Sequence, residues 1–186
     1  MQTCQPKIML KKLLILSLVL APFIGAAQTD TPQIPIPMKK GLIDYEQTIS
    51  LNTSLPRQAQ YKNMISWFND TFSNTGGNII TADEKSGEIN GTGNFKVRTS
   101  QTGNYYWLRF AVTIKLNDSV YTFKATNVYE KPVEKGISNE FSKIEYRWWD
   151  FRQGHPWSVE DTVLFRRMDS TMNSLMIALQ NKIGKH

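Results

Sequence analysis

The segment YYWLRFAVTIKLNDSVYTFKATNVY, residues 105–129, alternates apolar and polar residues in two runs that Asn117-Asp118 separates. Alternation with a period of two is typical of half-buried strands, and a short polar pair between two such runs predicts a tight hairpin. That loop pairs three sets of apolar residues across the hairpin: Ile114 with Tyr121, Val112 with Phe123, and Phe110 with Ala125. One face of the hairpin is therefore expected to be buried.

The opposite face of this hairpin is expected to stay open. It carries Trp107, Arg109, Thr113, Lys115, Thr122 and Lys124. An aromatic ring and several cations on one open face make Trp107 and Arg109 candidates for contact with a partner.

Three more strands are predicted upstream of the hairpin. Alternation over residues 43–51 predicts the first. Residues 78–85 and 87–98 predict two others, joined by a turn at Ser86-Gly87.

Two helices are predicted, one in each half of the chain. The apolar spacing over residues 61–72 predicts the first, with Ser54 as its cap, Pro56 in its first turn and Gly76-Gly77 after its end. The second begins at Ser158, which with Asp161 resembles a capping box. Its apolar stripe is Leu164, Met168, Met172, Leu175, Leu179 and Ile183.

The predicted order is therefore β-α-β-β-β-β-α. A chain with this order is expected to form an α+β domain, a single antiparallel sheet with two helices packed on one face.

The N-terminus predicts export. Residues 1–27 combine lysines, a short apolar run and a Gly-Ala-Ala site, which together are typical of a cleaved signal peptide. An uncleaved anchor is the alternative, and translation from Met9 would still give a complete signal. Because Cys4 precedes the apolar run, we do not expect a lipoprotein. Residues 28–40 predict a proline-rich linker, and residues 41–186 a single domain.

Composition limits the chemistry of the mature chain. Cys4 is the only cysteine, so cleavage leaves neither disulfides nor thiolates. The net charge falls from +6 to +3 because the signal takes three lysines with it. We therefore expect no nucleic-acid partner. No second apolar run follows the signal, so we expect no stable membrane span after cleavage. The predicted signal peptide leads us to expect a location in the periplasm or cell envelope.

The residues Ile43, Tyr61 and Trp67, with the segment DEKSGEINGTG at 83–93, resemble the family called domain of unknown function 4468. The resemblance covers about residues 42–131, whereas residues 134–157 have no counterpart in it. It implies a TBP-like fold, the arrangement of one repeat of the TATA-binding protein, and secretion by Bacteroidetes. The family has no known catalytic residues, so the resemblance implies none here.

The sequence predicts no catalytic residues, metal site or cofactor. His155 lies in a Gly-His-Pro loop, and no Gly-x-Ser-x-Gly motif accompanies it. The carboxylates Asp83, Glu84 and Glu88 flank a turn, where acidic residues are usually solvated. The glycines Gly87, Gly91 and Gly93 are expected to relieve crowding in the sheet.

The segment RWWDFRQGHPW, residues 147–157, allows two interpretations. In the first, a period-two arrangement packs Tyr146, Trp148 and Phe151 under the last helix while Arg147 and Arg152 reach water. In the second, Trp149 and Trp157 form an exposed stacking platform. The candidate contact residues are Trp107, Arg109, Arg147, Trp149, Arg152 and Trp157.

Two functions remain open. The first is a non-enzymatic binding or assembly module of the cell envelope, whose partner is an envelope protein or a glycan. The second is a glycan-binding or glycan-hydrolysing protein that uses Asp83, Glu88 or Asp150. Two carboxylates meeting in a hollow lined by tryptophan would favour the second.

Overall fold

The computed structural model describes residues 34–51, 54–101, 103–133 and 140–183. All of them belong to one compact unit, residues 32–186. The predicted signal peptide lies outside the described residues.

Seven strands form one antiparallel sheet in the order β1-β2-β6-β5-β4-β3, with β7 paired to β6. The strands are β1 (Met38–Lys39), β2 (Leu42–Ser50), β3 (Asn78–Asp83), β4 (Glu88–Arg98), β5 (Tyr105–Leu116), β6 (Val120–Val133) and β7 (Ser142–Lys143). The helices are α2 (Arg57–Phe72), the 3-10 turn η1 (Ser73–Thr75), α3 (Tyr146–Arg152) and α4 (Val159–Ile183). The predicted α+β fold is confirmed.

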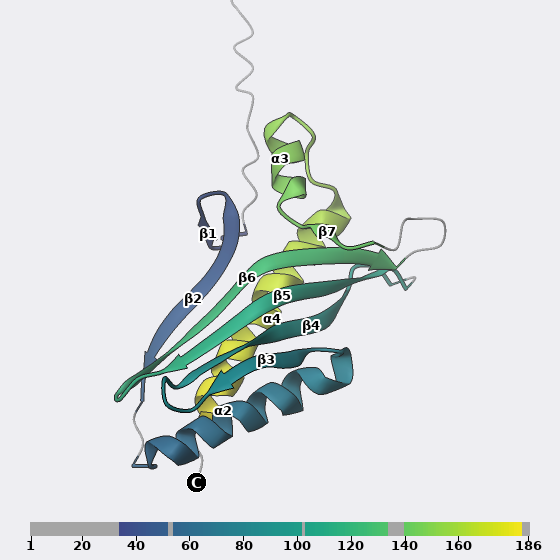
Figure 1. Ribbon diagram of the computed structural model, residues 1–186. Helices are drawn as coiled ribbons and strands as arrows, with labels where there is room; N and C mark the ends of the chain where they lie inside the picture. Colours follow the sequence, from purple (N-terminus) through teal and green to yellow (C-terminus); the bar gives the residue numbers. More distant parts are fainter. Residues whose placement is uncertain (1–33, 52–53, 102, 134–139, 184–186) are drawn as a thin grey trace, which may run out of the picture. The chain divides into compact units, whose positions relative to one another are not determined.

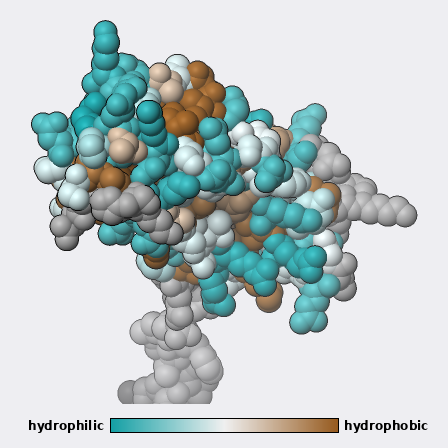
Figure 2. All heavy atoms as spheres, turned by 90° about the horizontal axis from the view of Figure 1, so that it is seen from below, coloured by the Kyte–Doolittle hydropathy of each residue, from teal (hydrophilic) through white to brown (hydrophobic). Residues whose placement is uncertain are grey.

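The helices α2 and α4 pack on one face of the sheet and leave the other face open. Figure 1 shows α4 passing behind the strands and α2 lying along the β3 edge. Buried residues from the inner sheet face and from both helices form one core, which includes Phe68, Phe123 and Met172. Seen from below, the surface is mostly hydrophilic, with hydrophobic residues showing in small groups (Figure 2).

The central hairpin has the predicted faces but a different register. Leu116 pairs with Tyr121 and Ile114 with Phe123, two residues away from the predicted pairing. The turn lies one residue further along the chain than predicted, because the Asn117 N–H donates to the Val120 carbonyl and these two residues flank Asp118 and Ser119. A shift of two residues preserves which side chains point inward, so the buried face was predicted correctly.

A β-bulge in β6 changes the alternation beyond the predicted hairpin. The register shifts between Arg109 and Ala111, and Asn127 opposite them has a φ of 53°. Asparagine is among the few residues that adopt this left-handed conformation readily. The extra residue places Val128 inside and turns Tyr129 to the open face.

The helix α2 begins without the predicted cap. Pro56 occupies the capping position and makes no side-chain bond, so the prediction for Ser54 is wrong. The glycines after the helix act as predicted, since Gly76 has a φ of 82°. A Cβ on Gly91 would lie 2.4 Å from Cζ of Phe68, so a glycine at this position is what allows α2 to approach β4 so closely.

The last helix begins with the predicted capping box. The Ser158 hydroxyl accepts the Asp161 N–H at 3.0 Å, and the Asp161 carboxylate accepts the Ser158 N–H at 2.8 Å. The predicted stripe is buried except for Leu175, which is half-buried.

The folded part extends further toward the N-terminus than Gly41. Ile34 and Ile36, within the predicted linker, pack against the core. Met38 then pairs with Ile43 in the short β1–β2 hairpin.

Candidate functional site

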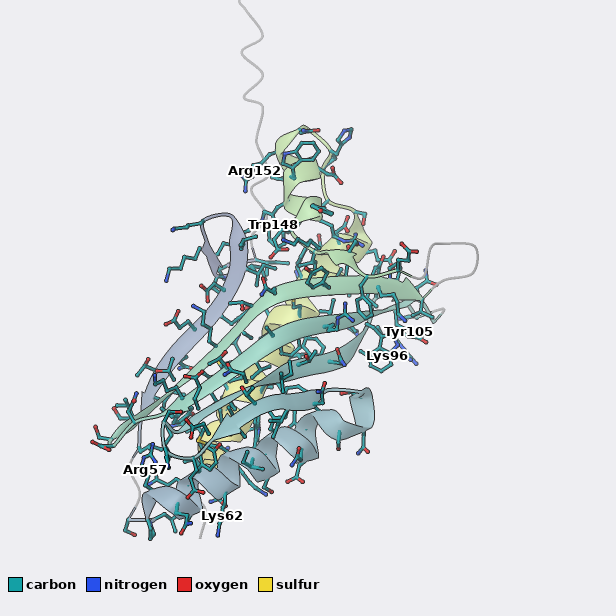
Figure 3. The ribbon with its side chains drawn as sticks, viewed as in Figure 1. Arg57, Lys62, Lys96, Tyr105, Trp148 and Arg152 are labelled. Atoms are coloured by element: carbon teal, nitrogen blue, oxygen red, sulfur yellow. The ribbon has the colours of Figure 1, made fainter. Side chains whose placement is uncertain are left out.

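One half of the open sheet face gathers cations and aromatic rings. We call it the basic–aromatic face and define it as Lys96, Arg98, Tyr105, Trp107, Arg109, Tyr129, Lys131, Phe141 and Lys143. The strands β4, β5 and β6 with β7 supply these residues. Figure 3 shows two of them, Lys96 and Tyr105, together at one end of the sheet.

Strand register interleaves the charges with the rings. Trp107 lies between Lys96 on β4 and Lys131 on β6. Arg109 has Tyr129 as its neighbour on β6. Directly paired residues in an antiparallel sheet have neighbouring side chains, so each of these rings is adjacent to a cation.

Several of these cations rest on aromatic rings. The Lys96 Nζ lies 3.4 Å from the centre of the Tyr105 ring, and the Arg109 Cζ lies 4.0 Å from that of Phe141. The Lys131 Nζ lies 5.2 Å from the Phe141 ring. Cation–π contacts position a cation without cancelling its charge, so this half of the face keeps a net positive charge.

Charge on the open face is segregated between its two ends. At the far end Lys124 pairs with Asp44 and Glu46, and Lys115 pairs with Glu88. Among the described residues, none of the five cations of the basic–aromatic face takes part in an ion pair.

The bulge at Asn127 produces this segregation. It turns Lys131 toward the open face and Glu130 toward the inner layer, where Glu130 is only 5% exposed. Without the bulge, Glu130 would share the open face with Arg109 and would neutralise part of its charge.

A shallow hollow of about 440 Å³ adjoins this face. Its lining includes Arg109, Tyr129 and Phe141, together with Asn78 and with Asn94, the strand neighbour of Arg109. Guanidinium and amide groups beside rings can donate hydrogen bonds to an acidic group while an apolar part of the same ligand stacks.

A second surface lies on α3. Tyr146 and Trp149 are 61% and 60% exposed. They line a groove of about 730 Å³ together with Gly41, Glu145, Asp150 and Arg152. The helix stands above β7, the short strand that pairs with β6 (Figure 1), and Figure 3 shows Arg152 on it.

Arg147 anchors α3 to the rest of the domain. Its Nε donates to both oxygens of Glu130 on β6, at 2.7 and 2.9 Å, and its guanidinium pairs with Asp161 on α4. It also lies over the Tyr106 ring, 5.1 Å from its centre. The guanidinium is therefore engaged within the fold.

The pKa values of this ion pair reflect its burial. Burial raises the pKa of the Glu130 carboxyl above its ordinary value, and the hydrogen bond and charge of Arg147 oppose that rise. Burial also disfavours the charged form of Arg147, but the bond to Glu130 and the nearby carboxylates outweigh it and raise its pKa. Each partner therefore favours the charged form of the other.

Two tryptophans hold the other side of α3 against α4. Trp157 stacks on Phe165 with ring centres 4.4 Å apart, and Trp148 meets the Trp157 ring edge-on at 4.7 Å. The Trp157 indole N–H donates to the Arg147 carbonyl at 3.2 Å. These rings belong to the scaffold of α3.

The fold can be compared with that of known proteins. Residues 45–131 match the family described as "Domain of unknown function (DUF4468) with TBP-like fold". The chain contains a DUF4468 domain. No curated protein matches it.

Two solved structures share the fold of this DUF4468 domain. A DUF4468 family protein from Bacteroides ovatus has a TM-score of 0.64 and 12% identity, over 81% of this chain and 91% of that one. A TBP-like protein from Parabacteroides distasonis has a TM-score of 0.59 and 14% identity, over 79% of this chain and 98% of that one. At these identities the likeness shows the fold alone.

The structure places the six predicted contact residues in three different settings, and only Trp107 and Arg109 lie within the residues that match DUF4468. Trp107 and Arg109 lie on the basic–aromatic face, as part of the open surface. Trp149 and Arg152 line the α3 groove. The other two, Arg147 and Trp157, are engaged within the fold, so Trp149 and Trp157 do not form one platform.

The predicted period-two arrangement of residues 146–151 is wrong, because this segment is helical. Trp148 packs toward α4 as predicted, with its ring 4.1 Å from that of Phe165. Tyr146, however, is exposed beside Trp149 because residues three apart share one side of a helix. The sequence pattern gave no sign of this pairing.

The other candidate residues for chemistry have structural surroundings. Asp83 accepts the Lys85 N–H within the β3–β4 turn, and Glu88 pairs with Lys115. His155 is exposed in the loop after α3. Within the described ranges, no three acidic, histidine or cysteine side chains come together to hold a metal ion, and no helix is long and apolar enough to cross a membrane.

Proposed function

We propose that this protein is an exported, non-enzymatic binding module of the cell envelope that holds an acidic polysaccharide on its basic–aromatic face. The observation that carries the proposal is the segregation of charge on the open sheet. Five cations without carboxylate partners among the described residues alternate there with aromatic rings. The N-terminal sequence supports export to the envelope.

A carboxylated sugar polymer suits the chemistry of this face. Its carboxylates match Arg109, Lys131 and their neighbours, and the apolar faces of its rings can stack on Trp107 and Tyr129. The hollow beside Arg109 offers amide donors to the hydroxyl groups. The ligand is held by a row of such contacts along the strands, and none of them requires a reaction.

Paired charge variants test this function. Arg109→Gln with Lys131→Gln removes two cations from the basic–aromatic face, and Lys115→Gln with Lys124→Gln removes two from the opposite end as the control. Calorimetric titration with polygalacturonate should show the first pair weakening binding by about tenfold, roughly 0.7 kcal/mol for each charge. The control pair should stay within about twofold, and binding should weaken as salt is added.

Two results would contradict the proposal. Equal losses in the two pairs would mean that net charge matters and the basic–aromatic face does not. Tighter binding of a single-stranded oligonucleotide than of polygalacturonate would make the ligand a nucleic acid. Uncharged dextran serves as the reference for binding that does not depend on charge.

A further inference from the structure

The α3 groove has a chemistry different from that of the basic–aromatic face. Its exposed parts are the two rings of Tyr146 and Trp149, with Asp150, Glu145 and Arg152 around them. Two carboxylates and one guanidinium leave it without the excess positive charge of the sheet face. Large exposed aromatic side chains in a hollow are typical of a binding surface.

The rings are held on a rigid support. The Glu145 carboxylate accepts the Ile43 N–H at 3.0 Å, which ties the start of α3 to β2. Arg147 ties the same helix to β6 and α4 through Glu130 and Asp161. A ligand on Tyr146 and Trp149 therefore meets side chains whose helix is already fixed, which lowers the entropic cost of binding.

The spacing of the rings favours a flat ligand that covers about one turn of helix. Tyr146 and Trp149 are three residues apart, a rise of about 4.5 Å, and lie on the same side of α3. Gly41 also lines the groove; its φ is 79°, and a Cβ there would meet no atom within 4 Å. The groove is thus open beside Gly41.

The polar groups around the rings favour hydroxyl groups as partners. A carboxylate can only accept hydrogen bonds when ionised and a guanidinium can only donate them, whereas a hydroxyl does both. Asp150 and Arg152 on the two sides of Trp149 would each be satisfied by the hydroxyls of one sugar. A charged polymer would gain from one of these groups and be repelled by the other.

We infer that the α3 groove is a non-hydrolytic binding subsite for an uncharged glycan, which stacks on Trp149 and Tyr146. This binding goes beyond the proposed function, because the residues of the α3 groove are different from those of the basic–aromatic face, which holds acidic polymers. The Glu145 carboxylate already accepts a backbone N–H. Glu145 therefore helps to build the site and is not a free acid or base that could work with Asp150 in hydrolysis.

The test uses the protein isolated from its host and three uncharged probes: cellohexaose, mannohexaose and chitohexaose. Calorimetric titration should detect binding of at least one of them. Trp149→Ala and Tyr146→Ala should each weaken that binding about tenfold or more. Ile177→Ala, which removes a similarly exposed apolar side chain from α4, is the matched control and should leave it unchanged.

Four results would overturn the inference. The first is that none of the probes binds. The second is that the Trp149→Ala variant binds them as tightly as the wild type. Shortened oligosaccharides in the mixture would make the groove an active site. Self-association that Trp149→Ala abolishes, without sugar binding, would make it an interface between two copies of the chain. The melting temperature of each variant is measured alongside, so that a loss of binding is assigned only to a folded protein.

Discussion

Replacing Arg147 with Met should destabilise the domain strongly at neutral pH. The change keeps a long unbranched side chain but leaves the buried Glu130 carboxylate without its cationic partner. Breaking a buried ion pair in this way costs about 3–5 kcal/mol. Because the Arg147 side chain is 25% exposed, water replaces part of the lost interaction, and we expect about 3 kcal/mol.

The loss should depend on pH in a defined direction. Burial alone already raises the pKa of Glu130, and without Arg147 nothing opposes that rise. A carboxyl whose pKa is higher in the folded state contributes stability below its unfolded pKa and loses it as pH rises through the folded value. The variant should therefore lie closest to the wild type near pH 4 and fall furthest below it near pH 7.

Urea denaturation at both pH values, followed by circular dichroism, measures the difference. Adding Glu130→Gln to the Arg147→Met variant should recover about 1–2 kcal/mol at pH 7, because it replaces the unpaired charge with a neutral amide. A loss below about 1 kcal/mol at pH 7, with no dependence on pH, would refute the reasoning. In that case Arg147 would not be what holds α3 in place.

Four further substitutions test the core and the sheet. Tyr121→Phe removes a buried hydroxyl that has no partner in the described structure; it should raise the free energy of unfolding by up to about 1 kcal/mol in thermal scans. Burial raises the pKa of Tyr121 to about 12. The wild type should therefore lose more stability than this variant as pH rises through about 10 to 12. Equal losses of stability in the two proteins at alkaline pH would contradict this. Gly91→Ala would push a Cβ against the Phe68 ring and should cost about 2 kcal/mol or more by urea denaturation, whereas a neutral result would mean that α2 can move away. Phe123→Ala should cost about 3–5 kcal/mol and Lys115→Ala less than about 0.5, and the reverse order would exchange the two faces of the sheet.

The sequence predicted those parts of the fold that depend on local patterns. Strand patterns located the five longer strands, and helical spacing with the Ser158–Asp161 capping box located α4. The register of the central hairpin could not be read from Asn117-Asp118, because a turn displaced by one residue shifts the pairing by two and keeps the same residues inside. The pattern specifies the face of a strand more strongly than its exact partner.

The candidate site could be predicted only in part. Trp107 and Arg109 were placed on the open face by simple alternation. Tyr129 and Lys131 were missed because the bulge at Asn127 reverses the alternation; Val128, an apolar residue out of phase with Tyr121, was the one local sign of it. The place of Phe141 on this face depends on β7, and a strand of two residues is too short to show an alternating pattern in the sequence.

The helix α3 could not be predicted because its stability comes from contacts distant in sequence. Aromatic residues favour strands and have only modest helix propensity, so RWWDFR reads more easily as extended chain. In the structure Glu130 and Asp161 hold Arg147, and Phe165 receives the ring of Trp157. None of these partners is within one helical turn of α3.

The central claim, that the basic–aromatic face binds acidic glycans, is tested most directly by the indole N–H resonances of the five tryptophans in a titration with trigalacturonate. Each tryptophan reports on a known place: Trp67 on the core, Trp148 and Trp157 on the α3 scaffold, Trp149 on the groove and Trp107 on the basic–aromatic face. We expect the Trp107 resonance to shift with saturation and the other four to stay in place. A Trp107 resonance that does not move at saturating ligand, or a shift confined to Trp149, would contradict the claim.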